Sequence, residues 1–318
     1  MSELLDQVRR CVRTRHYSPK TETAYVSWVR RFVRFHGTRH PSTLGAAEVS
    51  AYLSHLATVR KVSASTQNQA LSALVFLYRE VLGADLPWLE DLTRAKRPTR
   101  LPTVLSVEEM QALLGQLAGV HWLITSLLYG GGLRLMEGLR LRAQDVDLDR
   151  GEILVRRGKG QKDRVTMLPA KLRRPLAEHL ERARQQHRLD LSAGAGYVAM
   201  PDALARKYPG AGRQWRWQWV FPASRIYRDR DTGERRRHHV HESGVTRAIT
   251  EAGRNAGLVK RVTSHVLRHS FATHLLAAGY DIRTIQELLG HRDVATTMIY
   301  THVLNRGGRG VRSPLDEM

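Results

Sequence analysis

The stretch TSHVLRHSFATHLLAAGYDIRTIQELLGHRDVATTMIY, residues 263–300, decides both the fold and the chemistry of this chain. A histidine and an arginine stand three residues apart in it, as His265 and Arg268. His291 follows a glycine, and Tyr300 lies nine residues beyond that histidine. The combination offers cationic hydrogen-bond donors for a phosphodiester and a hydroxyl that attacks it. It predicts an enzyme that cuts DNA through a covalent phosphotyrosine.

Local signals predict how these side chains converge. Thr263 or Ser264 is placed to cap a helix that carries the first histidine and the arginine on one face. A second helix, over residues 281–289, ends at a glycine. Asp293 then caps a last helix with the tyrosine two turns in. Taken alone, a helical histidine is more often structural, and a tyrosine late in a helix more often packs in a core.

The charge of the chain predicts a polyanionic partner. The 318 residues include 51 Lys and Arg against 30 Asp and Glu, a net charge of +21. A hydrophobic content of 42% is enough for a packed core, and the length suggests about two domains. Nucleic acid is the leading partner, because phosphate contacts release counterions. The minority of acidic residues speaks against nucleases with clustered carboxylates and magnesium, and a merely basic protein is the plain alternative.

The remaining composition restricts the compartment. Cys11 is the one cysteine, which excludes an internal disulfide or a cysteine metal site and fits a reducing cytosol. The first residues lack the apolar core of a signal peptide. The longest apolar stretch, near residues 122–128, is far too short to span a bilayer, and no amphipathic membrane anchor stands out. We therefore expect a cytoplasmic protein with no membrane partner.

Residues 1–90 read as a first domain of helices joined by short turns. Residues 91–104, DLTRAKRPTRLPTV, combine two prolines with four basic residues and read as a linker. Residues 105–318 form the second domain, which opens with the capping box Ser106-x-x-Glu109. The basic residues of the first domain could form an ordinary solvated surface, but with this net charge we favour a DNA-facing one. The candidate DNA contacts are Arg30, Arg31, Arg34 and Lys61.

The second domain is expected to be mainly helical with a small β-sheet. Helices are expected over residues 122–129 and 171–189, and two strands within residues 152–168 flank a Gly-Lys-Gly turn. The segment after residue 191, to about residue 225, is rich in Gly, Trp and Arg and reads as an insertion, followed by a basic hairpin. The tail, residues 304–318, is basic and rich in glycine before it ends acidic.

Breaking a phosphodiester without a metal makes three demands. Negative charge on the non-bridging oxygens must be stabilised, and the planar fork of arginine matches those oxygens. A nucleophile must attack in line, and a tyrosine leaves the cut strand energy-rich and resealable. The leaving 5′ oxygen must be protonated, which a lysine or a histidine can do. No cofactor and no metal are expected.

Four blocks of the sequence resemble the tyrosine recombinase family, in the family's order. Residues 265–274, HVLRHSFATH, resemble its H-x-L-R-H-x-F-A-T-H box. LLGH at 288–291 and TTMIYTHV at 296–303 resemble its LGH…T…Y-T-H block. YGGGLRLMEGL at 129–139 resembles the first-arginine box, and Gly-Lys-Gly at 158–160 resembles the turn that presents the family's lysine.

The resemblance implies that Arg134 and Arg268 clamp the scissile phosphate and that His291 supports it. It implies that Lys159 and His265 transfer protons and that Glu137 braces the site. Tyr300 would attack the phosphate. Lys162 is a rival to Lys159, but the flanking glycines favour Lys159, because they permit the tight turn that exposes it. His269, His274 and His302 match flanking positions and are expected to be structural.

Within the family, the insertion is similar to the extra segment of integron integrases. KYPGA at 207–211 and WRWQWVFP at 215–222 carry this likeness. Such enzymes recombine gene cassettes between a duplex attI site and attC sites folded from one strand, whose hairpins carry protruding bases. Stacking on those bases is the role suggested for a set of aromatic residues: Trp215, Trp217, Trp219, Tyr227, His238, His239 and His241. One alternative is that the tryptophans pack the insertion onto the core, and we expect a split in which some rings pack and others stack. Another alternative is that the histidines bind a metal.

By this resemblance we expect a two-domain tyrosine recombinase clamp, in which residues 1–90 form a helical DNA-binding domain of the core-binding (SAM-like) kind. Residues 105–318 are expected to form a mainly α catalytic domain that contains a small β-sheet. The expected function is integron-type recombination of attI and folded attC through a 3′-phosphotyrosine, by four copies of the chain on DNA. The alternatives are a duplex-only recombinase of the phage or chromosome-dimer type, a type IB topoisomerase, and a DNA-binding regulator without catalysis.

Overall fold

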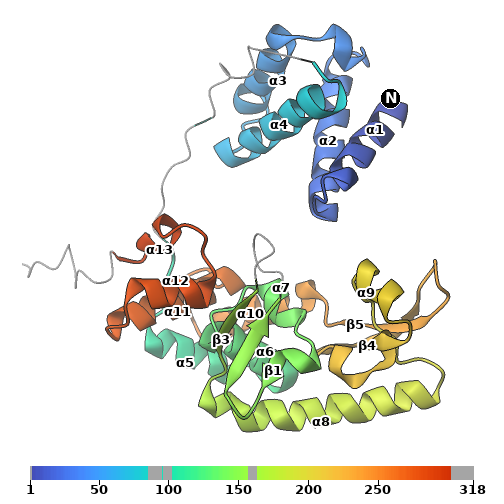
Figure 1. Ribbon diagram of the computed structural model, residues 1–318. Helices are drawn as coiled ribbons and strands as arrows, with labels where there is room; N and C mark the ends of the chain where they lie inside the picture. Colours follow the sequence, from blue (N-terminus) through green and yellow to red (C-terminus); the bar gives the residue numbers. More distant parts are fainter. Residues whose placement is uncertain (1, 85–94, 96–101, 157–162, 302–318) are drawn as a thin grey trace, which may run out of the picture. The chain divides into compact units, whose positions relative to one another are not determined.

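The computed structural model describes residues 2–84, 95, 102–156 and 163–301 (Figure 1). By its internal contacts the chain divides into two compact units, residues 1–100 and 101–318. Each unit has its own hydrophobic core and is described by itself. No helix of the described ranges is both long and apolar enough to cross a membrane.

The first unit is a bundle of four α-helices: α1 (Ser2–Thr14), α2 (Pro19–Phe35), α3 (Ala46–Thr58) and α4 (Ala64–Phe76). Ser18 caps α2 by accepting from the Thr21 N–H, and Pro19 occupies the first helical position, where no donor is lost. After Phe76, α4 continues as a π-helical turn, η2 (Leu77–Val81). That turn buries Tyr78, whose hydroxyl donates to the Leu44 carbonyl at 3.0 Å and ties the end of α4 to the loop before α3.

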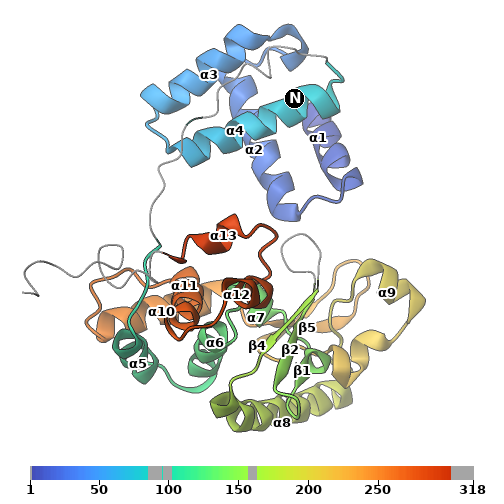
Figure 2. The ribbon, with the colours of Figure 1, turned by 60° about the vertical axis from the view of Figure 1, so that its left-hand side comes forward.

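The second unit is built around α6 (Gly119–Gly130), which packs against α8 (Ala170–Ser192), α10 (Glu242–Asn255) and α11 (Ser264–Ala277) (Figures 1 and 2). Its buried face includes Leu123, Ile124, Leu127 and Leu128. The remaining helices are α5 (Val107–Gly115), α7 (Leu135–Leu139), α9 (Asp202–Lys207), α12 (Ile282–Leu289) and α13 (Ala295–Met298).

Two small antiparallel sheets complete the second unit. The first has the order β1 (Val146–Asp147), β2 (Glu152–Val155), β3 (Arg164–Met167), and the second pairs β4 (Pro222–Arg228) with β5 (Arg235–His239). Within the described residues, four 3₁₀ turns lie between the helices and strands: η1 (Pro41–Thr43), η4 (Ala143–Asp145), η5 (Ala211–Arg213) and η6 (Trp215–Trp217). The expected strands around the Gly-Lys-Gly turn are therefore present, while the turn itself, residues 157–162, lies outside the described residues.

The chain between α8 and α10 comprises the insertion and the basic hairpin that follows it, and both are hereafter called the insertion. Two arginines fix it to the rest of the unit. Arg237 on β5 makes a bidentate pair with Asp190 of α8, at 2.6 and 2.7 Å, and both side chains are buried. The Arg142 guanidinium lies over the Trp219 ring, with its Cζ 3.2 Å from the ring centroid. The same guanidinium donates to the carbonyls of Trp217 and Ala199, which closes the insertion onto the strand-bearing part of the unit.

The expectation for the last helix was wrong. α13 covers only Ala295–Met298, so Tyr300 follows the helix rather than lying two turns inside it. The segment contains several β-branched residues, Val294, Thr296, Thr297 and Ile299, which lose side-chain freedom in a helix and lower its stability. Asp293 does accept from the Ala295 N–H at 2.9 Å, as a capping residue would.

Asp190→Ala should lower the free energy of unfolding by about 3–5 kcal/mol, because it leaves the Arg237 guanidinium buried without its counter-charge. Urea unfolding followed by tryptophan fluorescence measures the change. Glu178→Ala, which breaks the Arg174–Glu178 pair on the same helix, is the matched control. The Arg174 and Glu178 side chains are 92% and 53% exposed, so the control should lose less than about 1 kcal/mol of unfolding free energy. Equal losses in both variants would contradict an anchoring role.

Candidate active site

Arg268 is a buried cation at the centre of the second unit. It lies on α11, which Thr263 caps by accepting from the Val266 N–H. The residue is 4% exposed, and its guanidinium donates to the carbonyls of Gly132 and Leu289, both at 2.5 Å. Burial, with the charges of neighbouring arginines, lowers the pKa of Arg268 to about 9, so the side chain is still cationic at neutral pH. Two backbone carbonyls therefore fix the direction of this charge.

The turn that supplies one of these carbonyls requires glycine. Gly132 has φ +60°, and a Cβ there would lie 2.5 Å from the ring of Phe271. The turn also brings the Gly131 carbonyl to the Thr166 hydroxyl of β3, at 2.8 Å. The Gly-Gly-Gly run of the sequence thus lets the chain pass close to α11 and the sheet together.

Glu137 gathers three arginines from three elements. Its carboxylate accepts from Arg134 Nη1 at 2.6 Å and from Arg164 Nη2 of β3 at 2.7 Å, and it lies 3.8 Å from Arg268 Nη1. It also accepts from the Arg134 backbone N–H at the start of α7. Burial alone would raise the pKa of Glu137, but the hydrogen bond and charge of Arg164, then those of Arg134, outweigh it and lower the pKa to about 2.

Arg164 was not among the expected site residues. Besides Glu137 it contacts the end of α12, donating from Nε to the Leu288 carbonyl at 2.9 Å. It also passes Gly290 so closely that a Cβ there would lie 2.7 Å from Arg164 Cδ. Its place at the end of the basic run GKGQKDR was the only sequence signal, and that run looked like a turn rather than part of a buried network.

Tyr300 is buried, and a histidine of α11 holds its hydroxyl. The residue is 1% exposed, and its Oη lies 2.8 Å from Nδ1 of His269. Burial raises the pKa of Tyr300, while the charges of Arg268 and Arg134 oppose this. His269 was expected to be structural, so its contact with the tyrosine is new. His274 is structural in its contacts, because it joins the Tyr129 hydroxyl to the Leu105 carbonyl.

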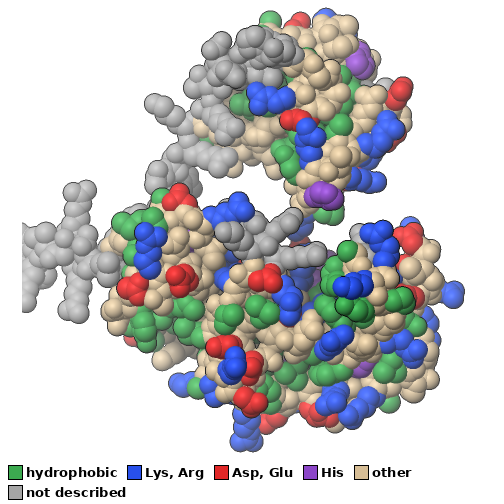
Figure 3. Space-filling model, viewed as in Figure 1, with side chains coloured by type: hydrophobic (Ala, Val, Ile, Leu, Met, Phe, Trp, Pro, Cys, Tyr) green, Lys and Arg blue, Asp and Glu red, His purple; other side chains and the backbone are tan. Residues whose placement is uncertain are grey.

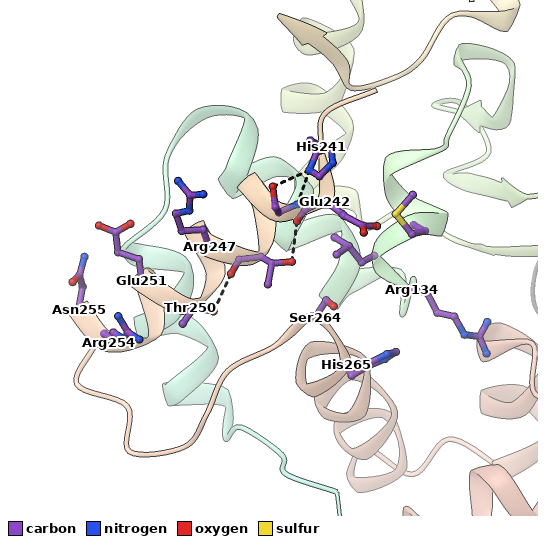
Figure 4. A pocket seen from close by; sticks show the side chains of 14 residues that line it. Arg134, His241, Glu242, Arg247, Thr250, Glu251, Arg254, Asn255, Ser264 and His265 are labelled. Carbon is purple, nitrogen blue, oxygen red and sulfur yellow. Dashed lines mark hydrogen bonds between the residues drawn. The ribbon is translucent and has the colours of Figure 1, made fainter. Parts of the chain in front are cut away.

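The other expected catalytic residues differ in their exposure and in their contacts. His265 is exposed and lines an open hollow together with Arg134 and the outward face of α10. Figure 4 shows these two residues at one end of the hollow and Arg247 and Arg254 at the other. His291 follows the left-handed Gly290 at the end of α12, and its Nδ1 lies 2.9 Å from the Thr297 hydroxyl. Lys159, Lys162 and His302 lie outside the described residues.

The aromatic residues of the insertion are divided between packing and exposure. Trp219 and His239 are buried, and the Trp219 indole donates to the Arg237 carbonyl, so neither ring is open to a base. We therefore leave these two out of the candidate DNA contacts. Trp215 and Trp217 are half-buried, and three residues are exposed: Tyr227, His238 and His241. His241 also caps α10 by accepting from the Ser243 N–H.

Arginines accompany the exposed part of the insertion. Arg225, Arg228, Arg230 and Arg235 are exposed on or beside β4 and β5, where Figure 3 shows several Lys and Arg side chains (blue) on the right of the second unit. Arg184 of α8 lies 6.0 Å from the Trp215 ring centroid. No group of three or more metal-ligating side chains is found among the residues that the structure describes, the three histidines of this region included.

The basic candidates of the first unit lie on α2 and before α4. Arg31 and Arg34 are exposed on α2 and Arg30 is half-buried, while Lys61 is exposed in the turn before α4. The Arg31 guanidinium lies 4.9 Å from the Trp28 ring centroid, and the Trp28 indole donates to Gln69 of α4. A basic residue is thus held over an aromatic ring on the outside of this helical bundle.

The family model described as the phage integrase family matches residues 103–306. The chain belongs to the phage integrase family. A second model, the phage integrase N-terminal SAM-like domain, matches residues 4–88 of this integrase.

Relatives and solved structures agree with this placement. The integrase is 55% identical over 316 residues to an integrase/recombinase of Escherichia coli, covering 99% of this chain and 94% of the relative. It is 36% identical over 292 residues to the tyrosine recombinase XerA of Thermococcus kodakarensis, covering 90% of this chain and 86% of the relative. Its fold is similar to that of a lambda integrase dimer bound to a COC′ core site, with a TM-score of 0.64, 16% identity and 99% of both chains covered.

The integrase is therefore a tyrosine recombinase, an enzyme that cleaves and rejoins DNA strands at specific sites. The expected fold class, mainly α with small β-sheets, is confirmed, and so is the enzyme class. These relatives are an integrase/recombinase and a tyrosine recombinase, which does not distinguish the integron type, so that type remains a prediction.

Glu137 should make the integrase acid-sensitive in a defined window. Its pKa falls from 4.5 to about 2 on folding, so its stabilisation is fully present above pH 4.5 and is lost as the pH falls towards 2. The shift corresponds to about 3 kcal/mol. Glu137→Gln should remove this pH dependence from the free energy of unfolding, measured by urea titration between pH 2 and 6.

The matched control is Glu152→Gln, on the exposed side of β2. Its unfolding curve should keep the full acid-side slope of the unmodified integrase. A Glu137→Gln variant that keeps that slope as well would show that the carboxylate is not stabilised by its arginines.

Proposed function

We propose that the integrase is a site-specific recombinase of the integron type, which moves gene cassettes between a duplex attI site and attC sites folded from a single strand. The observation that carries this proposal is the anchored insertion between α8 and α10. It is fixed at its base by Asp190–Arg237 and Arg142–Trp219, and it leaves aromatic and basic side chains exposed beyond these anchors. Such side chains are what a pocket for protruding bases requires.

The reaction would use the centre around Glu137. Arg134 and Arg268 bind the non-bridging oxygens of the scissile phosphate, and Glu137 with Arg164 holds the first of them in place. Tyr300 attacks phosphorus and forms a 3′-phosphotyrosine, which keeps the energy of the broken bond for rejoining. His265 and Lys159 serve the leaving 5′ oxygen, and His291 supports the phosphate.

The charges of the site support this assignment. Three guanidinium groups against one carboxylate leave two positive charges, 3 − 1 = +2, around Glu137. Attack on a phosphodiester builds up a second negative charge on the phosphoryl oxygens. Fixed donors aimed at such charge stabilise the transition state more than the ground state.

DNA binding would involve both units. We propose that Arg30, Arg31, Arg34 and Lys61 of the first unit contact the phosphate backbone, and that Trp215, Trp217, Tyr227 and His238 of the insertion contact protruding bases. Four copies of the integrase would assemble on two sites and exchange one pair of strands at a time. A duplex-only recombinase is the second candidate, because the same catalytic centre serves both.

Tyr300→Phe should abolish the covalent protein–DNA adduct while leaving DNA affinity within about twofold, because it removes only the attacking oxygen. The adduct on a nicked core site is measured on denaturing gels, and affinity by gel shift. An adduct that still forms with Tyr300→Phe would assign the nucleophile to another residue.

The substrate type is tested with attC supplied as bottom strand, top strand or duplex, each paired with duplex attI. The folded bottom strand should recombine at least about tenfold better than the duplex. A preference for the duplex would favour the second candidate. Ready relaxation of a plasmid without any att site would instead indicate a topoisomerase.

Tyr227→Ala should lower recombination of the folded strand by about 5- to 150-fold, which corresponds to the 1–3 kcal/mol of one stacked base. Adduct formation on a nicked duplex core site should be unchanged. Tyr280→Ala is the matched control, since Tyr280 is 56% exposed against 38% for Tyr227 and lies between α11 and α12. Losses that are equal on both substrates would contradict a base-binding role.

A further inference from the structure

His269 is the side chain of the described chain that hydrogen-bonds to the Tyr300 hydroxyl. The 2.8 Å separation between its Nδ1 and Tyr300 Oη is that of an ordinary O–H···N hydrogen bond. The two rings lie 5.5 Å apart between centroids. His269 comes directly after Arg268 on α11, so the contact joins the tyrosine to the helix that carries the buried arginine.

The surroundings keep the imidazole of His269 neutral. Burial lowers its pKa, and the charges of His265 and Arg268, both on α11, act in the same direction. Tyr300 faces it from the segment after α13, and Arg134 of α7 adds its charge at the tyrosine. In the tautomer that carries its proton on Nε2, the neutral imidazole accepts the hydrogen bond of the Tyr300 hydroxyl at Nδ1.

The reaction needs an acceptor in addition to a donor. Cleavage removes a proton from the tyrosine hydroxyl and delivers one to the leaving 5′ oxygen. His265 and Lys159 are assigned to the leaving oxygen in the mechanism above. The tyrosine proton then requires another base, and a general base must lie within hydrogen-bond reach of the proton it takes.

We propose that His269 is a catalytic residue whose Nδ1 accepts the Tyr300 proton during strand cleavage. The inference rests on the proposed role of Tyr300 as nucleophile. As the Oη–H bond breaks, its proton passes to His269 Nδ1 and its electron pair forms the Oη–P bond. The P–O5′ bond breaks, and the 5′ oxygen takes a proton from the donor on the other side. Resealing reverses each transfer, so His269 returns the proton to Oη.

The phosphate also makes the transfer electrostatically possible. Protonating His269 beside Arg268 is unfavourable in the free protein, because both groups would be positive. A bound phosphodiester between Arg134 and Arg268 adds a negative charge that offsets this cost. Tyr300 is 1% exposed, so DNA must displace what covers it, and His269 acts as a base only in the DNA complex.

The experiment measures single-turnover adduct formation on a nicked duplex core site for His269→Asn. The asparagine amide oxygen reaches the place of Nδ1 and keeps a hydrogen bond to Tyr300, but it takes up no proton. The rate should fall by roughly 10²- to 10⁴-fold, the usual contribution of a general base, with DNA affinity unchanged. The acid-side fall of the rate in the unmodified integrase should disappear in the variant.

A second substrate carries sulfur in place of the bridging 5′ oxygen, so that the leaving group needs no proton. The defect of His269→Asn should persist on it, while that of His265→Asn should be relieved. His274→Asn is the matched control, because His274 Nδ1 also lies 2.8 Å from a tyrosine hydroxyl, that of Tyr129, on the same helix. It should cleave at the normal rate. If His269→Asn does not fold by circular dichroism, His269→Gln takes its place in the same assay.

Three results would overturn the proposal. An unchanged rate would make the hydrogen bond incidental, and a faster rate would make His269 a lock on the tyrosine. Rescue by the sulfur substrate would place His269 at the leaving group. An adduct that forms with Tyr300→Phe would instead refute the assignment of the nucleophile, which separates the two questions.

Discussion

The catalytic unit of this integrase depends on one buried carboxylate. Glu137 is the negative charge around which Arg134, Arg164 and Arg268 gather, with guanidinium nitrogens 2.6, 2.7 and 3.8 Å from its carboxylate oxygens. These arginines come from the start of α7, from β3 and from α11, so the ion cluster also fixes how the sheet and the two helices meet. Without the carboxylate, three guanidinium groups would repel one another at low solvent exposure, where screening by water is weak. The same cluster therefore stabilises the fold and leaves a surplus of positive charge for a phosphate.

Backbone carbonyls complete what the carboxylate begins. Arg268 donates to the carbonyls of Gly132 and Leu289, which leaves its charge but few of its hydrogen-bond directions free. The first carbonyl belongs to a left-handed glycine, Gly132, with φ +60°. The second, of Leu289, comes directly before another left-handed glycine, Gly290, with φ +63°. A side chain at either position would collide with Phe271 or Arg164. The glycines are thus part of the electrostatics, because they let the main chain come close enough to hold the arginine.

The sequence predicted what depends on local chemistry and missed what depends on contacts between distant residues. The capping box at Ser106 and the cap at Thr263 are fixed by neighbours three residues away, and the structure contains both. Arg164, paired with Glu137 across 27 residues, and Asp190, paired with Arg237 across 47, carry no local signal. The hydrogen bond of His269 to Tyr300 depends on how the chain after α13 returns to α11, and the early end of α13 was itself not predicted. The expected division of the tryptophans agrees with the structure as far as burial goes, because Trp219 packs while Trp215 and Trp217 stay half-buried, and stacking on bases stays a prediction.

The insertion shows why catalysis and substrate choice can be separated in this fold. In Figure 1, α11, α12 and α13 lie towards one end of the second unit, and α9 with β4 and β5 lies towards the other. The insertion is held by its own buried pair and by Arg142 on Trp219, and neither of these interactions involves Glu137 or Tyr300. Interactions without shared partners usually contribute to stability independently of one another. Under the proposed function, side chains beyond these anchors can therefore change with the DNA that is recognised, while the arginine cluster and its glycines keep the geometry that cleavage needs.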